Sequence, residues 1–141
     1  DKYHLSKGYI HFVVKNGSLK DNRPEIKKAM SDLKELGIVW ESEGINPDNV
    51  SIEDLKDLGI AHLRTEKSLI SRVVNNASEY SSFSRFVASA LRDGFYITCT
   101  GIETKEEKEV AEHLMVSLLM GKYFYPPLDE KEFIQSIAYQ K

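Results

Sequence analysis

The sequence predicts an α/β fold in which about five parallel strands form an open sheet with covering helices, as a free sheet or as a partial TIM-barrel-like structure. Short runs rich in β-branched and aromatic residues alternate with segments whose apolar residues recur at helical spacing. The repeating unit of roughly 20 to 35 residues is typical of parallel βαβ architecture. A closed eight-stranded barrel takes ~250 residues. The 141 residues are therefore expected to form a single domain, 1–141, without a closed barrel.

The first quarter of the chain predicts a strand, a helix and a second strand. The run Tyr9–Val14 is β-branched and aromatic, and it is followed by the turn pair Asn16-Gly17. A helix is expected from Pro24, which suits a first turn, to Gly37, which suits a C-cap. The short apolar run Ile38–Trp40 is the second predicted strand.

The middle of the chain predicts a short helix, a strand and a long helical stretch. Ser51 opens a capping pattern for a helix that ends near Leu58, and the run Ile60–Leu63 is the third predicted strand. Helical spacing then continues from Leu69 to Arg92. The polar region 78–82 predicts a break into two helices there.

Two further strands and two helices are predicted near the end. The run Phe95–Thr98 is the fourth strand, and a Thr-x-x-Glu capping box opens a helix over 104–114. The fifth strand is Val116–Leu119. A last helix is expected to begin at Asp129 and Glu132, after two prolines.

Composition excludes several classes of function. Nineteen basic and 22 acidic residues give a net charge of −3, so binding to bare nucleic acid or to an anionic membrane surface is not expected. No apolar run approaches the roughly 20 residues of a membrane span, and residues 1–5 contain no signal-peptide h-region. Cys99 is the only cysteine, so no internal disulfide can form and a reducing compartment is expected. Cys99 itself is expected to be a small core residue. The expected location is the cytoplasm.

Functional groups are expected at the carboxyl ends of the predicted strands, where parallel α/β folds place their sites. The residues there are Lys15, Asn16, Glu41, Glu43, Arg64, Glu66, Thr100, Glu103, Met120 and Lys122. Three of the acids could converge on Mg²⁺, which prefers oxygen ligands. The alternative is that each acid is a solvated residue at a loop end.

The remaining candidate residues carry weaker signals. The histidines His4, His11, His62 and His113 have no metal-binding spacing, and His11 and His62 are expected to be packed or surface residues of strands. The aromatic run 123–125 could stack on a base or anchor a partner, or it could pack at the core or its rim.

Several segments, taken in order, resemble motifs of one family. They are Val14–Leu19, Leu33–Gly37, Gly101–Thr104, Met120–Phe124, Pro127-Leu128 and Glu132-Phe133. Their order and spacing resemble EAL domains, the bacterial cyclic di-GMP phosphodiesterases, over nearly the whole chain. The family's first strands, which carry the E-A-L motif and an asparagine, have no counterpart. The resemblance therefore implies an EAL-type fold of which this chain supplies the second half.

The residues at the family's site positions depart from its pattern. The family's I-T-E glutamate falls on Asn16, and its aspartate pair falls on Glu43 and Gly44. Its K-I-D lysine and aspartate fall on Arg64 and Glu66. The first glutamate of A-E-G-V-E-T falls on Thr100 and the glutamine of Q-G-Y on Met120, whereas the second glutamate of A-E-G-V-E-T is kept as Glu103. A two-metal hydrolytic site needs several oxygen ligands and an activated water. The carboxylate set here is incomplete for that purpose.

The resemblance thus implies a catalytically inactive EAL-like domain that serves regulation or protein interaction. No cofactor is expected, and Mg²⁺ enters only if the chain is an enzyme. A protein partner or a second copy of the chain is expected, with weak or no binding of cyclic di-GMP. Two alternatives are a cyclic di-GMP receptor, and a residual phosphodiesterase that the missing half of the barrel completes.

An open half-barrel also predicts an exposed sheet face. The residues expected to face inward are Phe12, Val14, Val39, Leu63, Ile97 and Leu118. The edges at Tyr9–Val14 and Val116–Leu119 would carry unpaired backbone groups. A symmetric homodimer would cover these groups, and the alternative is that the N-terminal segment or the Leu69–Arg92 helices fold across the face.

Overall fold

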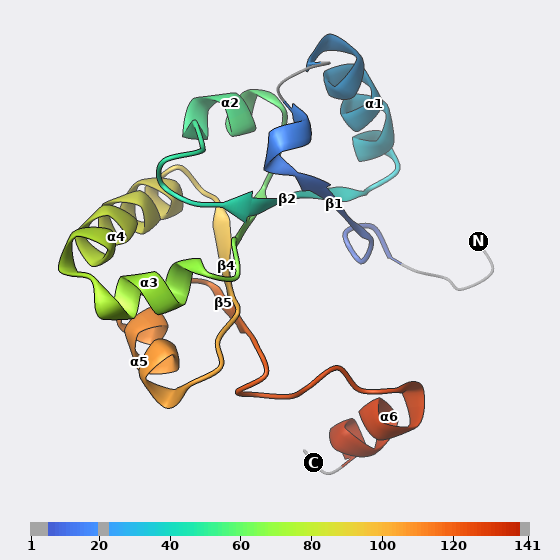
Figure 1. Ribbon diagram of the computed structural model, residues 1–141. Coiled ribbons are helices and arrows are strands. Elements are labelled where there is room, and N and C mark those ends of the chain that lie inside the picture. The colour runs from blue at the N-terminus through green and yellow to red at the C-terminus, as the bar shows by residue number, and fades with distance from the viewer. Residues whose placement is uncertain (1–5, 20–22, 139–141) are drawn as a thin grey trace.

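The computed structural model describes residues 6–19 and 23–138 and contains one five-stranded sheet (Figure 1). Its strands are β1 His11–Lys15, β2 Val39–Ile45, β3 His62–Thr65, β4 Tyr96–Thr100 and β5 Leu118–Met120. All neighbouring pairs are parallel and follow chain order, so β1 and β5 are the edge strands. The predicted fold class and both predicted edges are confirmed.

Helices follow the strands along the chain, and all but the last of them cover one side of the sheet (Figure 1). They are α1 Arg23–Glu35, α2 Ile52–Asp57, α3 Leu69–Asn75, α4 Ala77–Arg92, α5 Lys105–His113 and α6 Glu130–Ala138, with a 3₁₀ turn η1 over Asn16–Leu19. The last helix, α6, lies apart from the others at the end of a long segment. None of the helices in the described ranges is long and apolar enough to cross a membrane.

The second strand is longer than its sequence predicts. It continues from Trp40 through two glutamates to Ile45, because Glu41 and Glu43 alternate with buried residues and so occupy one face of a strand. Glu41 therefore lies within the strand, and its predicted place at the carboxyl edge is wrong. The other four strands lie within two residues of their predicted bounds.

The long helical stretch breaks at Asn76, and the predicted break at 78–82 is wrong. Asn76 has an extended backbone, and its side chain accepts hydrogen bonds from the N–H groups of Ser78 (2.9 Å) and Glu79 (3.2 Å). An asparagine at this position caps a new helix more effectively than serines interrupt an existing one. Ser81 instead stays helical and donates to the Ala77 carbonyl.

The predicted caps are present. Thr104 Oγ1 accepts from the N–H of Glu107, and the Glu107 carboxylate accepts from the N–H of Thr104, which completes a capping box. Asp129 and Glu132 bond reciprocally at the start of α6. These bonds satisfy backbone donors that a helix start otherwise leaves unpaired.

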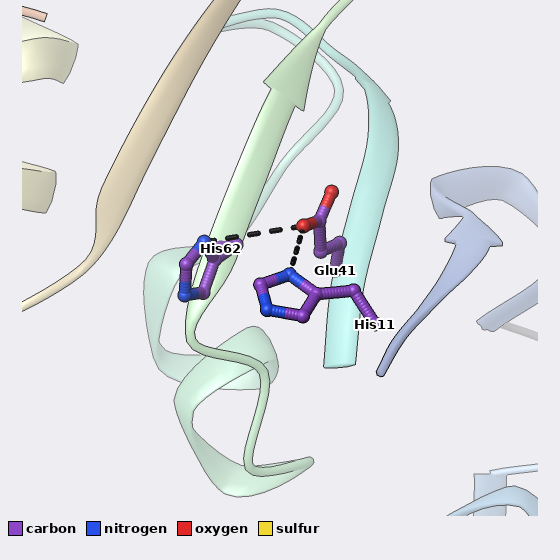
Figure 2. A group of neighbouring side chains, drawn as sticks. All are labelled: His11, Glu41 and His62. Carbon is purple, nitrogen blue, oxygen red and sulfur yellow. Dashed lines mark hydrogen bonds and ion pairs between the residues drawn. The ribbon is translucent and has the colours of Figure 1, made fainter. Parts of the chain in front are cut away.

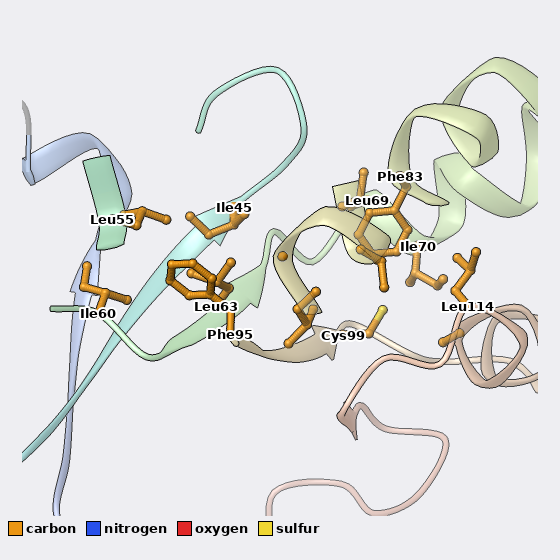
Figure 3. Close-up of a cluster of buried hydrophobic side chains, with 14 of the residues drawn as sticks. Ile45, Leu55, Ile60, Leu63, Leu69, Ile70, Phe83, Phe95, Cys99 and Leu114 are labelled. Atoms are coloured by element: carbon orange, nitrogen blue, oxygen red, sulfur yellow. The ribbon is translucent and has the colours of Figure 1, made fainter. Parts of the chain in front are cut away.

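The hydrophobic core lies between the sheet and the helices α1 to α5 (Figure 3). Leu63, Ile97 and Phe83 are fully buried there, as is Cys99, which confirms the prediction that this cysteine is a core residue. Burial raises the pKa of the Cys99 thiol to about 11, so it is protonated and a poor nucleophile at neutral pH.

The two faces of the sheet differ from the prediction. Pairing places Phe12 beside Trp40 and Leu63 beside Ile97, on the face that the helices cover. Phe12, Val14, Leu63 and Ile97 were thus expected on the wrong face, because a strand reverses its faces with a shift of one residue. The helices α3 and α4 lie on the covered side, so they do not fold across the open face.

Candidate functional site

The carboxyl ends of the strands enclose an open pocket of about 560 Å³. Six of the seven site residues predicted from the sequence line it: Asn16, Glu43, Arg64, Glu66, Thr100 and Met120. They lie at or near the carboxyl ends of all five strands and converge because parallel strands end at one edge of a sheet. Lys15 and Lys67 line the same pocket, so its charged side chains are three basic and two acidic.

Asn16 is held by the loop that follows β2. It is only 8% exposed, and its amide nitrogen donates to the carbonyl of Asn49 (2.9 Å) and lies 3.3 Å from the Asn49 side-chain oxygen. Asn49 in turn donates to the Gly44 carbonyl and accepts from the N–H of Asn46. The Asn16 side chain thus ties the end of β1 to this loop.

The Glu66 carboxylate is already paired at both oxygens. Oε2 accepts from the side chain of Asn46 (2.9 Å), and Oε1 pairs with the Arg72 guanidinium (2.7 Å) and accepts from the Ser68 hydroxyl (3.3 Å). The hydrogen bond from Asn46 is the main cause that lowers the pKa of Glu66. Burial opposes it, and the bond and charge of Arg72 add to the lowering. Glu66 is therefore an anion committed to the protein itself.

Glu43 has no hydrogen bond or ion pair within the described part of the chain, and it lies between two cations. Its register partners on the neighbouring strands are Lys15 on β1 and Arg64 on β3. Neighbouring strands of a sheet lie about 4.8 Å apart. Glu43 thus has a basic residue beside it on each neighbouring strand.

Arg64 crosses the wall of the pocket. Its guanidinium donates a hydrogen bond to the Met120 sulfur (3.2 Å). Its Nε atom lies 3.5 Å from the Glu41 carboxylate. A glutamine at position 120, the residue type of the family motif, would offer an amide there instead of a thioether. Arginine also stays charged at any ordinary pH, so Arg64 cannot serve as a general base.

Thr100 is committed to holding β4 against β3. It is 8% exposed, its hydroxyl donates to the Thr65 carbonyl (2.6 Å), and its N–H donates to the Thr65 hydroxyl (2.9 Å). The hydroxyl proton is used in this bond, so Thr100 contributes packing and alignment to the site.

Glu103 lies outside this pocket, in an adjoining one of about 480 Å³. It is 62% exposed, and its nearest cation is Lys122, at 4.0 Å. Phe124 and Tyr125 line the same second pocket and are largely exposed, so the aromatic run forms a rim and is not part of the core. The acids at 43 and 66 share one pocket, and Glu103 does not join them.

Two glycines allow the loops at this edge to approach closely. A Cβ on Gly101 would lie 2.3 Å from the Lys67 carbonyl oxygen, and Gly101 has a φ of 84°. A Cβ on Gly121 would lie 1.9 Å from the Ile102 carbonyl oxygen. Both pockets therefore depend on backbone contacts that only glycine permits.

We expect Gly101→Ala to destabilise the protein by roughly 1–3 kcal/mol, because it combines a strained φ with a backbone clash. Gly94→Ala is the matched control, since Gly94 has a similar φ of 85° with nothing within 4 Å of its Cβ position. Urea unfolding measures both variants. Equal losses would show that the close approach at Lys67 contributes nothing.

Sequence reasoning missed the residues that organise the pocket. Asn46 and Asn49 come from the loop after β2, and Arg72 comes from the first turns of α3. The only signal was the run 46–49, Asn-Pro-Asp-Asn, which is typical of a turn held by its own side chains.

The donor set does not fit a pair of divalent ions, which the family resemblance implies. A two-metal site needs carboxylates free to bridge or bind the ions. Glu66 is paired with Arg72, Glu43 lies between two cations, and Asn16 offers a neutral amide in place of a carboxylate. An added positive ion would also meet Lys15, Arg64 and Lys67.

Known proteins share this sequence pattern and fold. The family model of the EAL domain matches residues 1–127. The chain is 25% identical over 140 residues to the signaling protein YkoW of Bacillus subtilis (strain 168), covering 99% of this chain and 18% of that protein.

Solved EAL structures superpose closely on the five-stranded sheet and its helices. The PaMucR phosphodiesterase in complex with c-di-GMP matches with a TM-score of 0.84 and 17% identity, over 94% of this chain and 53% of that one. The EAL domain of Mycobacterium smegmatis DcpA matches with a TM-score of 0.86 and 14% identity, over 98% and 62%. The chain thus spans less than two thirds of these relatives. Because the family model accounts for most of its residues, the protein belongs to the EAL domain family.

Proposed function

We propose that this EAL domain has no phosphodiesterase activity and acts in cyclic di-GMP signalling as a cytoplasmic regulatory or protein-interaction module. The observation that carries the proposal is the state of the pocket carboxylates. The Glu66 carboxylate is bonded to Asn46 and Arg72, and Glu43 lies between Lys15 and Arg64. Glu43 is then the one pocket carboxylate without a partner in the described part of the chain, which is too few to hold two metal ions and activate water.

Hydrolysis of cyclic di-GMP with Mg²⁺ or Mn²⁺ tests this proposal. We expect no product above a control without protein, because Glu43 alone supplies too few oxygen ligands to hold two metal ions and activate water. An active EAL phosphodiesterase, assayed in parallel, verifies the conditions. Product that disappears in Glu43→Gln or Glu103→Gln would contradict the proposal and would restore the residual-enzyme alternative.

A cyclic di-GMP receptor is the second candidate, and one observation favours it. Lys15, Arg64 and Lys67 line a single pocket of about 560 Å³, and cations of this kind bind phosphate groups. Against it, Arg64 is engaged by Met120 and Glu41, and the two acids of the pocket repel phosphate.

We expect weak or no binding of cyclic di-GMP in a calorimetric titration, since no pair of free arginines is placed to clamp the phosphates. Arg64→Gln is the informative variant, because it removes a pocket cation without adding bulk. A dissociation constant in the low micromolar range that Arg64→Gln weakens would make the receptor function the preferred one.

A further inference from the structure

A second polar cluster lies on the open face of the sheet, apart from the pocket. It consists of His11, Glu41 and His62, from the adjacent strands β1, β2 and β3 (Figure 2). Glu41 precedes Glu43 by two positions, a shift of ~6.6 Å along a strand. The cluster is therefore one layer nearer the start of the strands than the residues of the family's site.

The three side chains point toward one another, as Figure 2 shows. His11 Nδ1 lies 2.5 Å from Glu41 Oε1, and His62 Nδ1 lies 4.0 Å from the same oxygen. One ligand atom of each residue falls within 4.8 Å of the other two. A tetrahedral zinc ion, with bonds of about 2.0–2.2 Å, sets its ligand atoms roughly 3.3 Å apart. Small side-chain rotations therefore bring all three to coordination distance.

The surroundings orient both histidines. A backbone carbonyl only accepts, so His11 Nε2 donates to the Gly8 carbonyl at 3.0 Å, and Nδ1 is the nitrogen that faces Glu41. A hydrogen bond of this kind, from the second ring nitrogen to a carbonyl, is typical of histidines that bind metals. His62 stacks on Tyr96 with ring centroids 4.9 Å apart.

The carboxylate is oriented as well. Arg64 Nε lies 3.5 Å from Glu41 Oε2, which leaves Oε1 directed at the two histidines. Glu41 and His62 have side-chain exposures of 13% and 18%, so the cluster is sheltered, and the more exposed His11 at 34% leaves it open to solvent on one side.

We propose that His11, Glu41 and His62 bind a single divalent transition-metal ion, with zinc as the expected ion. Two imidazoles and one carboxylate are a common three-ligand set for zinc, with water at the fourth position. Imidazole ligands favour zinc and its neighbours over Mg²⁺, which prefers oxygen. The ion would join the edge strand β1 to β2 and β3.

Metal binding by the whole chain tests the proposal. The chain is first treated with a chelator. One sample is then titrated with Zn²⁺ by calorimetry, and a second is dialysed against Zn²⁺ to measure its zinc content. A third sample receives Co²⁺ for its visible absorption. We expect one zinc per chain, a cobalt spectrum typical of tetrahedral coordination, and a higher Tm with zinc. Loss of a ligand in His62→Ala should weaken binding by more than the roughly 10–100-fold cost of losing an outer-shell partner.

His113→Ala is the matched control, because His113 is exposed at the end of α5, outside the cluster. It should bind zinc as the unaltered chain does. Glu41→Gln keeps the size of the side chain and tests the site even if His62→Ala folds poorly. The proposal is overturned if the unaltered chain takes up no zinc, or if Glu41→Gln and His113→Ala bind it equally.

Discussion

Phe83→Ala is expected to lower the free energy of unfolding by about 3–5 kcal/mol, the usual cost of removing a fully buried phenylalanine. Phe83 is 0% exposed on α4, and Figure 3 shows it beside Leu69 and Ile70 of α3, the helix that packs against α4. The cavity left by the ring would separate the two helices from the sheet. A loss of this size lowers the ratio of folded to unfolded protein by at least about two powers of ten.

Urea unfolding followed by circular dichroism measures this loss, with Phe133→Ala as the matched control. Phe133 is 55% exposed on α6, so its removal should change stability by no more than about 0.5 kcal/mol. Similar losses in the two variants would contradict the placement of α4 over the core.

The elements of the fold were predictable because their signals are local. The capping box at Thr104 and Glu107 depends on residues three apart, and the glycine after the first helix marks its end. The break at Asn76 was missed because a single asparagine is a smaller signal than a run of serines. Its strength comes from the two bonds that its side chain accepts, and these require the folded geometry.

The faces of the strands were predictable in principle. His62 and Arg64 flank Leu63, so the alternation of polar and apolar residues already indicates that Leu63 belongs on the covered face. The error came from assigning Phe12, Val14, Leu63 and Ile97 to the inner face because they are apolar. The open face of this sheet instead carries the polar residues His11, Glu41, His62 and Arg64 beside apolar ones.

The location of the candidate site was predictable, but the pairing of its side chains was not. Six of the predicted residues line one pocket, and the predicted strand ends alone were enough to indicate this, because parallel strands end at one edge of the sheet. The pairing of Glu66 with Arg72 was not predictable, because it depends on how α3 begins over the pocket. His11 and Glu41 lie 30 residues apart in the chain, so no linear motif marks their cluster.

We expect the chain to form a symmetric homodimer through the open face of the sheet. Apolar side chains flank the polar cluster on that face: Val13 is 41% exposed, Tyr96 56%, Leu118 54% and Met120 46%. A group of exposed apolar side chains beside polar residues is typical of surfaces that a partner covers. A twofold axis would place the same surface on both copies and would also shelter the edge strands.

Light scattering at tens of micromolar measures this directly, and we expect a particle of about twice the 16.1 kDa of one chain. Leu118→Glu should weaken the dimer by roughly 30-fold or more, the effect of losing a central interface residue and burying a charge. Leu36→Glu is the matched control, because Leu36 is 69% exposed just after α1, away from the open face. A particle of one-chain mass would contradict the dimer. A dimer that Leu118→Glu leaves intact would contradict the stacking of the two open faces, because a buried glutamate beside a second copy of itself cannot be accommodated without loss of affinity.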